Sequence, residues 1–459
     1  MKTFFLRSLL QKDGWHHNQY VRVDAQGRIV SISSETETDH LFETVEAWAI
    51  PGFQNAHSHA FQYAMAGLAE RHATGEVADD FWSWREAMYR LALRISPDDL
   101  QAIAAQLYAE MLRHGYTDVA EFHYVHHDQS GVPYSNLSEM GERLVAAASE
   151  VGIGITLIPI FYQKGGFGQA AVEGQKRFLS STVEDYFELY AASQKSCDLY
   201  EHAQTAVGIH SMRGVEPTDI QRVAKEGDQK APFHIHVSEQ LKEIEASLAY
   251  LKKRPVEWML ENIDLNSRYH FVHATHLTNS ETEALAKSGT HVVLCPSTEG
   301  NLGDGIFPLK SFQSFGGKWS IGTDSHVGLN PFEELRLLDY GQRLLSHKRN
   351  TFTSTEEGDS GKFAVDMAVL SGRKAMGNLS ETYFGIGDTF DAVLFKPDHP
   401  LIAATSESNM LSTFIYSTDS RMQYGTISKG KLQVKEGRHI HHSKISQDFK
   451  QLMQRLKNR

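Results

Sequence analysis

Residues 96–123 read SPDDLQAIAAQLYAEMLRHGYTDVAEFH and predict a helix that leads directly into a buried strand. Ser96 is suited to the N-cap and Pro97 to the first helical position, and apolar residues then recur at helical spacing. Gly115 is placed to end the helix, and residues 119–123 form the strand candidate that follows it. A helix followed at once by a buried strand is the repeating unit of parallel α/β folds.

The same alternation extends along most of the chain. Eight apolar stretches predict strands, and helical patterns separate most of them: 53–57, 119–123, 153–160, 205–210, 232–238, 269–274, 291–295 and 319–323. Eight strands alternating with helices predict an α/β fold, a (β/α)8 TIM-like barrel. The rival is an open doubly wound sheet, which commonly carries a Gly-rich phosphate turn after an early strand. The Gly-rich residues 165–168 lack that strand-to-helix context, and we expect a mobile loop there.

The two ends of the chain differ from this middle part. Short alternating strands with Gly-containing turns are predicted before residue 50, and again from about residue 384. We expect the β-rich ends to pair in one small β-sandwich. The predicted division is therefore a composite sandwich domain of residues 1–50 and 384–443, a catalytic barrel domain of residues 51–383, and a helical tail of residues 444–459.

Composition excludes several classes of function. The chain has 459 residues, of which 41% are hydrophobic and 22% charged, as in globular proteins and unlike disordered or fibrous ones. Its net charge of −12 makes it a poor candidate for binding nucleic acid or an anionic membrane. Its two cysteines make no disulfide framework, and no stretch has the about 18 apolar residues of a transmembrane helix. We expect a cytoplasmic protein that acts on a small molecule.

Histidine is the unusual residue type, with 24 copies. Three His-x-His pairs occur: His57 with His59, His234 with His236, and His439 with His441. Residues i and i+2 of a strand face the same side, so such a pair can hold a metal, although one pair alone is a weak signal. The last pair stands among polar residues beside His442, and we expect a solvated surface cluster there. His234 lies deeper in its strand, where a hydrogen-bonded core histidine is the expectation.

Five chemistry-bearing residues fall at the carboxyl ends of predicted strands, where barrel enzymes place their active sites. They are His57, His59, His236, His273 and Asp324. Glu239 follows His236 by three residues, at the strand exit. Taken alone, Asp324 would more often be a helix N-cap, and His270 and His276 are expected to be structural or peripheral. Chance placement of all five at strand ends is improbable, so we predict a metal-dependent catalytic site.

These residues resemble the amidohydrolase superfamily along nearly the whole chain. The resemblance rests on Pro51-Gly52-Phe53-Gln54-Asn55-Ala56-His57-Ser58-His59, His236-x-x-Glu239, His273 and Gly322-Thr323-Asp324. No lysine suited to a bridging carbamate ends the fourth strand, where His210 stands instead, so the likeness is to the mononuclear deaminase branch. Within it, residues 57–62, 80–85, 210–215 and 295–305 resemble the formimidoylglutamate deiminases.

The resemblance implies a role for each site residue. One divalent metal, with zinc as the first expectation, would be bound by His57, His59, His236 and Asp324. Glu239 and His273 would do the proton work. Substrate would be contacted by His210 and Arg213 at the fourth strand, and its carboxylates by Arg85, Gln62 and Tyr124. The implied reaction is hydrolysis of N-formimino-L-glutamate to N-formyl-L-glutamate and ammonia in histidine degradation, by a homodimer.

The chemistry of these residue types agrees with that implication. Three neutral imidazoles and one carboxylate leave an open position on zinc for water, whose pKa then falls toward about 7. The planar guanidinium of arginine binds carboxylates bidentately, which suits a substrate with two carboxylates. Structural or surface ion pairs are the alternative for Arg85 and Arg213.

Two other functions stay open at this point. An aminoheterocycle deaminase, acting on a purine, pterin or triazine, would share the metal site but would want aromatic stacking and have less use for Arg213. A non-enzymatic barrel scaffold is the remote alternative. Such descendants usually lose their ligands, whereas every ligand type is present here.

Overall fold

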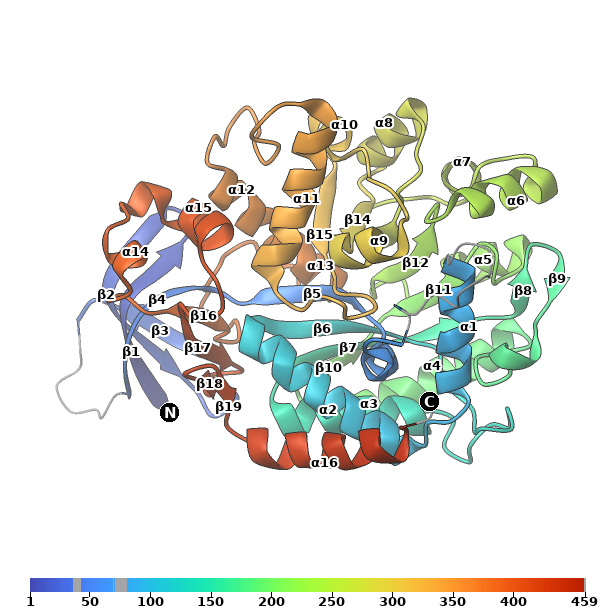
Figure 1. Ribbon diagram of the computed structural model, residues 1–459, viewed down its shortest axis with the longest axis horizontal. Helices are drawn as coiled ribbons and strands as arrows, with labels where there is room; N and C mark the ends of the chain where they lie inside the picture. Colours follow the sequence, from blue (N-terminus) through green and yellow to red (C-terminus); the bar gives the residue numbers. More distant parts are fainter. Residues whose placement is uncertain (36–42, 69, 71–80, 458–459) are drawn as a thin grey trace.

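The computed structural model describes residues 1–35, 43–68, 70 and 81–457, and its centre is a parallel barrel (Figure 1). The barrel strands are β5 (Phe53–Ser58), β6 (Tyr116–His123), β7 (Gly154–Phe161), β11 (Val207–Ser211), β12 (Phe233–Val237), β13 (Tyr269–His273), β14 (His291–Leu294) and β15 (Lys318–Ile321). They neighbour one another in this order, and every neighbouring pair is parallel. Each matches one of the eight predicted strands, so the predicted barrel is confirmed.

The first and last strands meet and nearly close the barrel. A parallel bridge joins Ser58 to Asp324, and the N–H groups of Thr323 and Asp324 donate to the His57 carbonyl at 3.1 and 3.0 Å. A short extra strand, β10 (Ala203–Thr205), also pairs with β7 but is not one of the eight barrel strands. Closure brings the carboxyl ends of β5 and β15 together, and these are the ends that carry predicted ligands.

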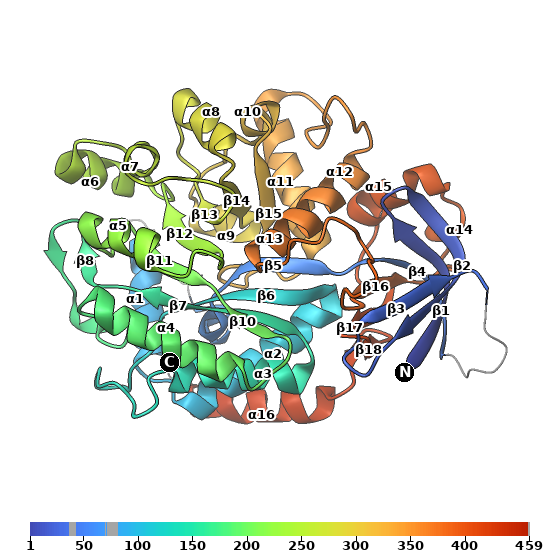
Figure 2. The same cartoon turned by 180° about the vertical axis from the view of Figure 1, so that it is seen from behind.

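Helices surround the barrel (Figure 2). They are α1 (Phe81–Ala92), α2 (Pro97–His114), α3 (Glu139–Val151), α4 (Val183–Cys197), α5 (Pro217–Glu226), α6 (Leu241–Leu251), α7 (Pro255–Asn262), α8 (Asn279–Ser288), α9 (Pro296–Leu302), α10 (Leu309–Ser314), α11 (Pro331–Ser346), α12 (Ser360–Asp366) and α13 (Gly372–Ala375). A π-helical stretch, Met367–Ser371, joins the last two, and short 3-10 helices cover Ala60–Met65 and Glu173–Gln175.

Helix α2 begins and ends as its sequence predicts. Ser96 Oγ accepts the N–H of Asp99, and the Asp99 side chain accepts the N–H of Ser96, which makes a reciprocal capping box. At the other end Gly115 adopts a left-handed conformation with φ of 100°. A side chain at Gly115 would meet Val393, so this position needs glycine for both conformation and space.

Both chain ends contribute to a second, eight-stranded sheet beside the barrel (Figure 1). Its strands, in spatial order, are β19 (Arg438–His439), β18 (Lys431–Lys435), β17 (Gln423–Ser428), β16 (Ala392–Phe395), β4 (Glu43–Pro51), β1 (Lys2–Gln11), β2 (Gly14–Val23) and β3 (Ile29–Ser33). The junction between the two ends is the antiparallel pair β16–β4. The predicted pairing of the ends is confirmed, while the exact domain boundaries stay a prediction. Two helices that were not predicted, α14 (Pro400–Ala403) and α15 (Glu407–Ser417), interrupt the C-terminal strands.

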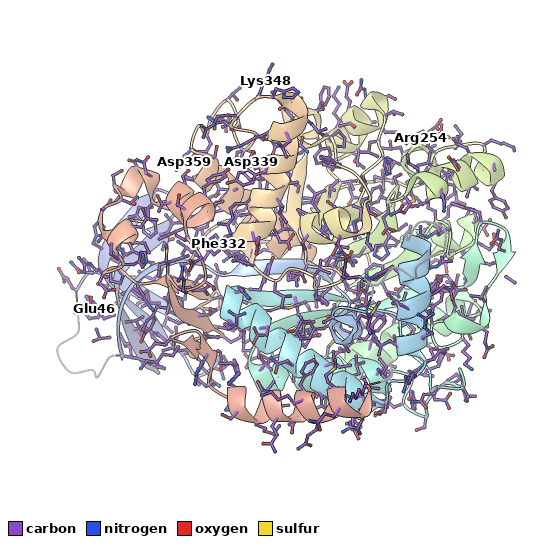
Figure 3. All side chains as sticks on the ribbon, viewed as in Figure 1. Glu46, Arg254, Phe332, Asp339, Lys348 and Asp359 are labelled. Carbon is purple, nitrogen blue, oxygen red and sulfur yellow. The ribbon has the colours of Figure 1, made fainter. Side chains whose placement is uncertain are left out.

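An aromatic contact ties this sheet to the barrel. Phe332 of α11, labelled in Figure 3, packs edge-to-face against Phe53 of β5 and Phe395 of β16, with ring centroids 5.1 and 5.6 Å apart. The C-terminal helix α16 (His442–Arg455) lies along α2 and buries Ile445 and Leu452.

Two expectations were wrong, one about a loop and one about a surface residue. Residues 165–168 belong to a small antiparallel hairpin, β8 (Lys164–Gly166) with β9 (Gln169–Ala170), because Gly168 at φ of 65° supplies its turn. The predicted surface position of His439 was also wrong: it is buried, because β19 packs against α2 and its Nε2 atom lies 2.9 Å from the carbonyl of Val151 at the end of α3. His441 and His442 are exposed as expected. Among the described residues, no helix is long and apolar enough to cross a membrane.

Candidate active site

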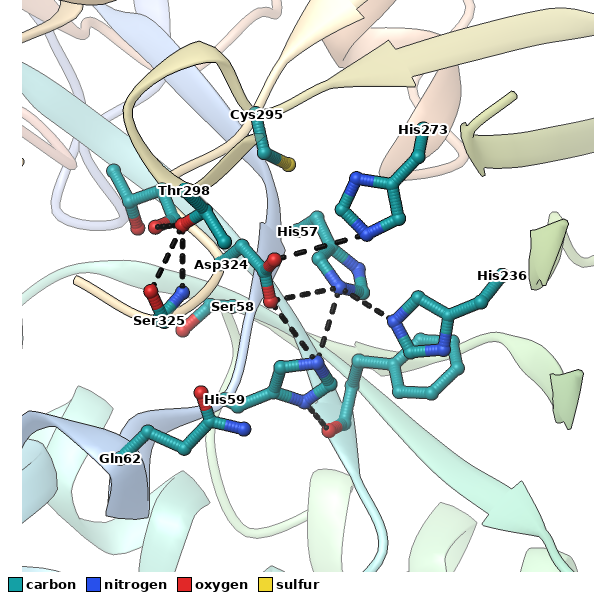
Figure 4. Close-up of polar contacts among 12 residues, drawn as sticks. His57, Ser58, His59, Gln62, His236, His273, Cys295, Thr298, Asp324 and Ser325 are labelled. Carbon is teal, nitrogen blue, oxygen red and sulfur yellow. Dashed lines mark hydrogen bonds and ion pairs between the residues drawn. The ribbon is translucent and has the colours of Figure 1, made fainter. Parts of the chain in front are cut away.

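Three histidine nitrogens converge at the carboxyl end of the barrel (Figure 4). The Nε2 atom of His57 lies 3.1 Å from Nε2 of His59 and 3.0 Å from Nε2 of His236. His57 and His59 come from the end of β5, and His236 comes from β12 on the opposite side of the barrel. All three side chains are buried.

Hydrogen bonds at Nδ1 fix the ring orientation of two of these histidines. His59 Nδ1 lies 2.8 Å from the Phe122 carbonyl, and His236 Nδ1 lies 2.9 Å from the His210 carbonyl. A carbonyl only accepts, so each Nδ1 carries the proton and each Nε2 presents a lone pair. Burial lowers the pKa of His57 to about 3 and that of His236 well below its usual value, so both rings are neutral. The ligand nitrogens of the three histidines all lie within 4.8 Å of one another, and imidazole nitrogens gathered in this way fit a metal ion.

Asp324, just beyond β15, adds a carboxylate to the three imidazoles. Its Oδ1 atom lies 3.4 Å from His57 Nε2 and 3.2 Å from His59 Nε2. Burial alone would raise the pKa of Asp324, but its hydrogen bonds with His57 and His59 outweigh burial and hold it well below its usual value. Three neutral imidazoles and one carboxylate suit zinc and related divalent ions.

His273 stands beside this group at the end of β13. Its Nε2 atom lies 3.7 Å from Asp324 Oδ2 and 3.9 Å from Glu239 Oε1, and its Nδ1 lies 3.2 Å from Glu299 Oε1. Burial alone would lower the pKa of His273, but the Glu299 hydrogen bond and the surrounding carboxylates raise it to about 10. Without a bound cation, His273 therefore favours its charged form at neutral pH.

Glu239 is held at the exit of β12 by backbone and side-chain contacts. The N–H groups of Ser238 and Glu239 donate to the buried carboxylate of Glu243 at 3.3 and 3.0 Å. Arg213 Nη2 donates to Glu239 Oε2 at 3.1 Å, and Arg213 Nη1 lies 3.7 Å from Glu243 Oε2. The ion-pair alternative for Arg213 is thus present in the structure, with Glu239 itself as its partner.

Three strand exits have left-handed backbone at residues that are not glycine. The φ angles are 53° for Ser238, 68° for His273 and 48° for Asp324. Such conformations cost roughly 1–3 kcal/mol each and cluster at functional sites. At these exits the His273 side chain lies 3.9 Å from Glu239 and 3.7 Å from Asp324.

A cavity opens beside these groups. It is lined by ten residues that the sequence predicted for the site: His59, Gln62, Arg85, Tyr124, His210, Arg213, His236, Glu239, His273 and Asp324. Its remaining lining is mostly aromatic and was not predicted: Trp84, Met88, Tyr89, Tyr162, Phe178 and Leu302. His57 is fully buried at the floor.

The polar lining already has a preferred arrangement. Gln62 Nε2 donates to the Tyr124 hydroxyl at 3.0 Å, while Gln62 Oε1 is buried and accepts no hydrogen bond from the described residues. The guanidinium of Arg85 lies 5.5 Å from the Tyr89 ring centroid. His210 stacks on Tyr162 with ring centroids 4.1 Å apart.

The structure thus brings all the predicted site residues into one region, while their individual roles stay predictions. Asp80, part of a segment that carried the resemblance, lies outside the described residues. The predicted core role of His234 is confirmed by its burial and by the 2.9 Å contact between its Nε2 and the Ala375 carbonyl. Asp324 is not a helix N-cap, since α11 begins later and is capped by Asn330. The sequence analysis missed Glu243 and the part played by Glu299; the only signal was their position just beyond predicted strand ends.

Comparison with known proteins agrees with this geometry. Residues 48–433 match the amidohydrolase family. Formimidoylglutamate deiminase of Pseudomonas aeruginosa is 39% identical over 457 residues, which cover 99% of this chain and 100% of that protein. The crystal structure of an amidohydrolase from Brucella melitensis superposes with a TM-score of 0.92 at 41% identity, covering 99% of this chain and 100% of that one. An adenosine deaminase from Xanthomonas campestris, crystallised with bound zinc, shares the fold at a TM-score of 0.80 and 20% identity, covering 100% and 98%.

The chain therefore belongs to the amidohydrolase family, and the predicted family membership is confirmed. It is a hydrolase of the kind that acts on carbon–nitrogen bonds, in a family whose members depend on metal ions.

Proposed function

We propose that this enzyme hydrolyses N-formimino-L-glutamate to N-formyl-L-glutamate and ammonia, with one zinc ion per chain. The observation that carries the proposal is the pairing of two features: a donor set of three histidines and one aspartate, and a cavity that contains two arginines, Arg85 and Arg213. The donor set suits amidine hydrolysis, and the arginines suit a substrate with two carboxylates. The near full-length likeness to a formimidoylglutamate deiminase supports the same substrate.

His57, His59, His236 and Asp324 would hold the ion. When bound there, a divalent ion supplies Lewis acidity, which makes water available as a nucleophile at neutral pH. The chain's own residues then have to orient substrate, move protons and balance charge.

Glu239 is the proton carrier in this proposal. Its Oε1 atom faces His273 and the ligand cluster, while its Oε2 atom is occupied by Arg213. Oε1 would accept a proton from water during attack on the formimino carbon and deliver it to the departing nitrogen. The Arg213 contact would keep the carboxylate in one orientation between these two transfers.

His273 would donate a hydrogen bond beside the reacting carbon. Its Nδ1 is engaged with Glu299, so Nε2 is the atom that points toward Glu239 and Asp324. An N–H donor at Nε2 would stabilise the oxygen of the tetrahedral intermediate.

Substrate carboxylates would be bound by the arginines at the outer side of the cavity. Arg85 and Arg213 line both this cavity and an adjoining outer one, which also contains Lys242. Gln62 Oε1 is an open acceptor for a substrate N–H group, and Tyr124 and His210 complete the polar wall. A place in histidine degradation and a homodimeric assembly belong to the same proposal.

The aromatic lining is the one observation that favours the alternative, an aminoheterocycle deaminase. Trp84, Tyr89, Tyr162 and Phe178 offer faces on which a planar ring can stack. Such a substrate would bring no carboxylate of its own to the two arginines.

Ammonia release by the purified holoenzyme separates these two functions. We expect turnover of N-formimino-L-glutamate and little or none of adenosine, a pterin or a triazine at the same concentration. Faster turnover of a ring substrate would reject the proposal. Metal content should be measured on the same preparation, and sedimentation should give the mass of a dimer.

A further inference from the structure

A second group of potential ligand atoms lies directly beside the three-histidine group. It consists of His273, Cys295 and Asp324, whose ligand atoms all lie within 4.8 Å of one another. All three residues are buried, Cys295 completely. Figure 4 shows the Cys295 sulfur pointing toward Asp324 and His273 from the position just after β14.

The two oxygens of Asp324 face different groups. Oδ1 lies near the Nε2 atoms of His57 and His59, whereas Oδ2 lies 3.7 Å from His273 Nε2. Two ligands on one tetrahedral zinc ion, each at about 2.0–2.2 Å, stand roughly 3.4 Å apart. A small movement would therefore let Oδ2 and Nε2 share an ion, with the Cys295 thiolate as a third ligand.

Glu299 supports both of the other ligand residues. Its Oε1 atom lies 3.2 Å from His273 Nδ1 and accepts the N–H of Cys295 at 2.9 Å. A carboxylate on the far nitrogen of a histidine is the usual support of a metal-binding imidazole. It leaves Nε2 as the atom that faces Asp324 and the sulfur.

We propose that His273, Cys295 and Asp324 form a second, inhibitory site for a thiophilic divalent cation such as Zn²⁺ or Cd²⁺. The ion would enter through the cavity that His273 and Asp324 line. On binding, the S–H bond of Cys295 breaks and a metal–sulfur bond forms. The thiol proton, and any proton on His273 Nε2, pass to solvent, and no electron is transferred.

The bound ion would inhibit the enzyme, because His273 Nε2 would coordinate the ion and could no longer donate a hydrogen bond to the substrate. This consequence rests on the proposed function, in which His273 acts at the reacting carbon. Occupancy of the site itself does not rest on it.

Cadmium titration of the holoenzyme, already holding one zinc per chain, tests the proposal. We expect a second equivalent of metal per chain by metal analysis, a thiolate-to-cadmium charge-transfer absorption in the ultraviolet, and a parallel loss of activity. Cys295→Ala and Cys295→Ser should both lose the absorption and bind the second equivalent at least about tenfold more weakly. Each variant is compared with its own activity before cadmium is added.

Cys197→Ala is the matched control, because Cys197 is the other buried cysteine and lies at the end of α4. It should keep the absorption and the second equivalent. The proposal is overturned if wild type takes up no second ion, if Cys295→Ala keeps the absorption, or if Cys197→Ala loses it. Absorption without loss of activity would overturn the inhibitory role. Metal count and absorption are measured without substrate, so they stand even if formiminoglutamate is not the substrate.

Discussion

The barrel interior contains two layers of buried histidines, one at the carboxyl ends of the strands and one slightly earlier along the strands. The upper layer is His57, His59, His236 and His273, at the strand ends. The lower layer is His234, His270 and His291, which lie earlier on β12, β13 and β14. In the lower layer the rings of His234 and His270 stack, with centroids 5.0 Å apart, and His270 contacts His291 at 5.1 Å.

The two layers differ in the groups that the ring nitrogens of their histidines face. In the upper layer, the Nδ1 atoms of His59 and His236 donate to backbone carbonyls, and the Nε2 atoms point into a shared space beside carboxylates. In the lower layer, His234 Nε2 faces the Ala375 carbonyl and the rings pack on one another. Residue type and burial are the same in both layers, so chemistry here follows from which lone pairs are left facing one another.

Sequence reasoning placed the upper-layer histidines at strand ends and His234 in the core, because strand alternation is a local property. Period and polarity located all eight barrel strands, and a spacing of two residues across the end of β5 predicted that His57 and His59 face the same side. The left-handed turns at Ser238, His273 and Asp324 could not be foreseen, because they depend on neighbouring strands and not on local propensity. The contact of Arg213 with Glu239 joins residues from two strand exits, and no sequence spacing encodes it.

The largest effect is expected from removing one of the four proposed metal ligands in or beside the upper layer. Asp324→Ala or His59→Ala should lose both bound metal and activity, because each removes one of four ligands and leaves the remaining lone pairs unshared. Metal analysis and ammonia release on the same sample would check this. Full activity in metal-free protein would contradict it.

The next largest effect is expected at the proton carrier. Glu239→Gln keeps the shape of the side chain but cannot accept a proton. It should keep its metal and lose about 10²–10⁴ in kcat, the usual contribution of general acid–base catalysis. A kcat close to that of wild type would show that another group takes the proton from water.

Arg85 and Arg213 form a matched pair that sharpens the substrate assignment. Arg85→Met should remove a charge-assisted contact of roughly 1.5–3 kcal/mol, which is about 10–150-fold in kcat/KM for formiminoglutamate. The loss should be much smaller for a formamidine that lacks the amino-acid portion. Arg213→Met should lower kcat/KM on both substrates, because Arg213 also holds Glu239.

Arg213→Lys tells the two roles of Arg213 apart. An ammonium lacks the bidentate fork, so lysine should recover only part of the loss on formiminoglutamate. Equal losses on both substrates for Arg85→Met would instead give Arg85 a structural role and remove its support for a dicarboxylate substrate. Metal content should stay at the wild-type value in all three variants.

The smallest effect on activity is expected in the lower layer, at His291, where the readout is stability. Burial, followed by the charges of Lys374 and Lys318, lowers the pKa of His291 to about 4, against 6.5 in an unfolded chain. As the pH falls below 6.5, the unfolded chain gains a proton on this ring that the folded chain does not, so the folded state loses stability until the pH passes about 4. The variant His291→Gln has no group that titrates at this position.

From pH 7.5 to pH 5, the free energy of unfolding of His291→Gln should therefore fall by about 2 kcal/mol less than that of wild type. Urea unfolding of both proteins at the two pH values measures the difference, with ammonia release at pH 7.5 expected to stay within about threefold of wild type because no His291 atom lines the cavity. A loss of metal from His291→Gln would show that the lower layer supports the upper one, and the two layers would then have to be treated as a single unit.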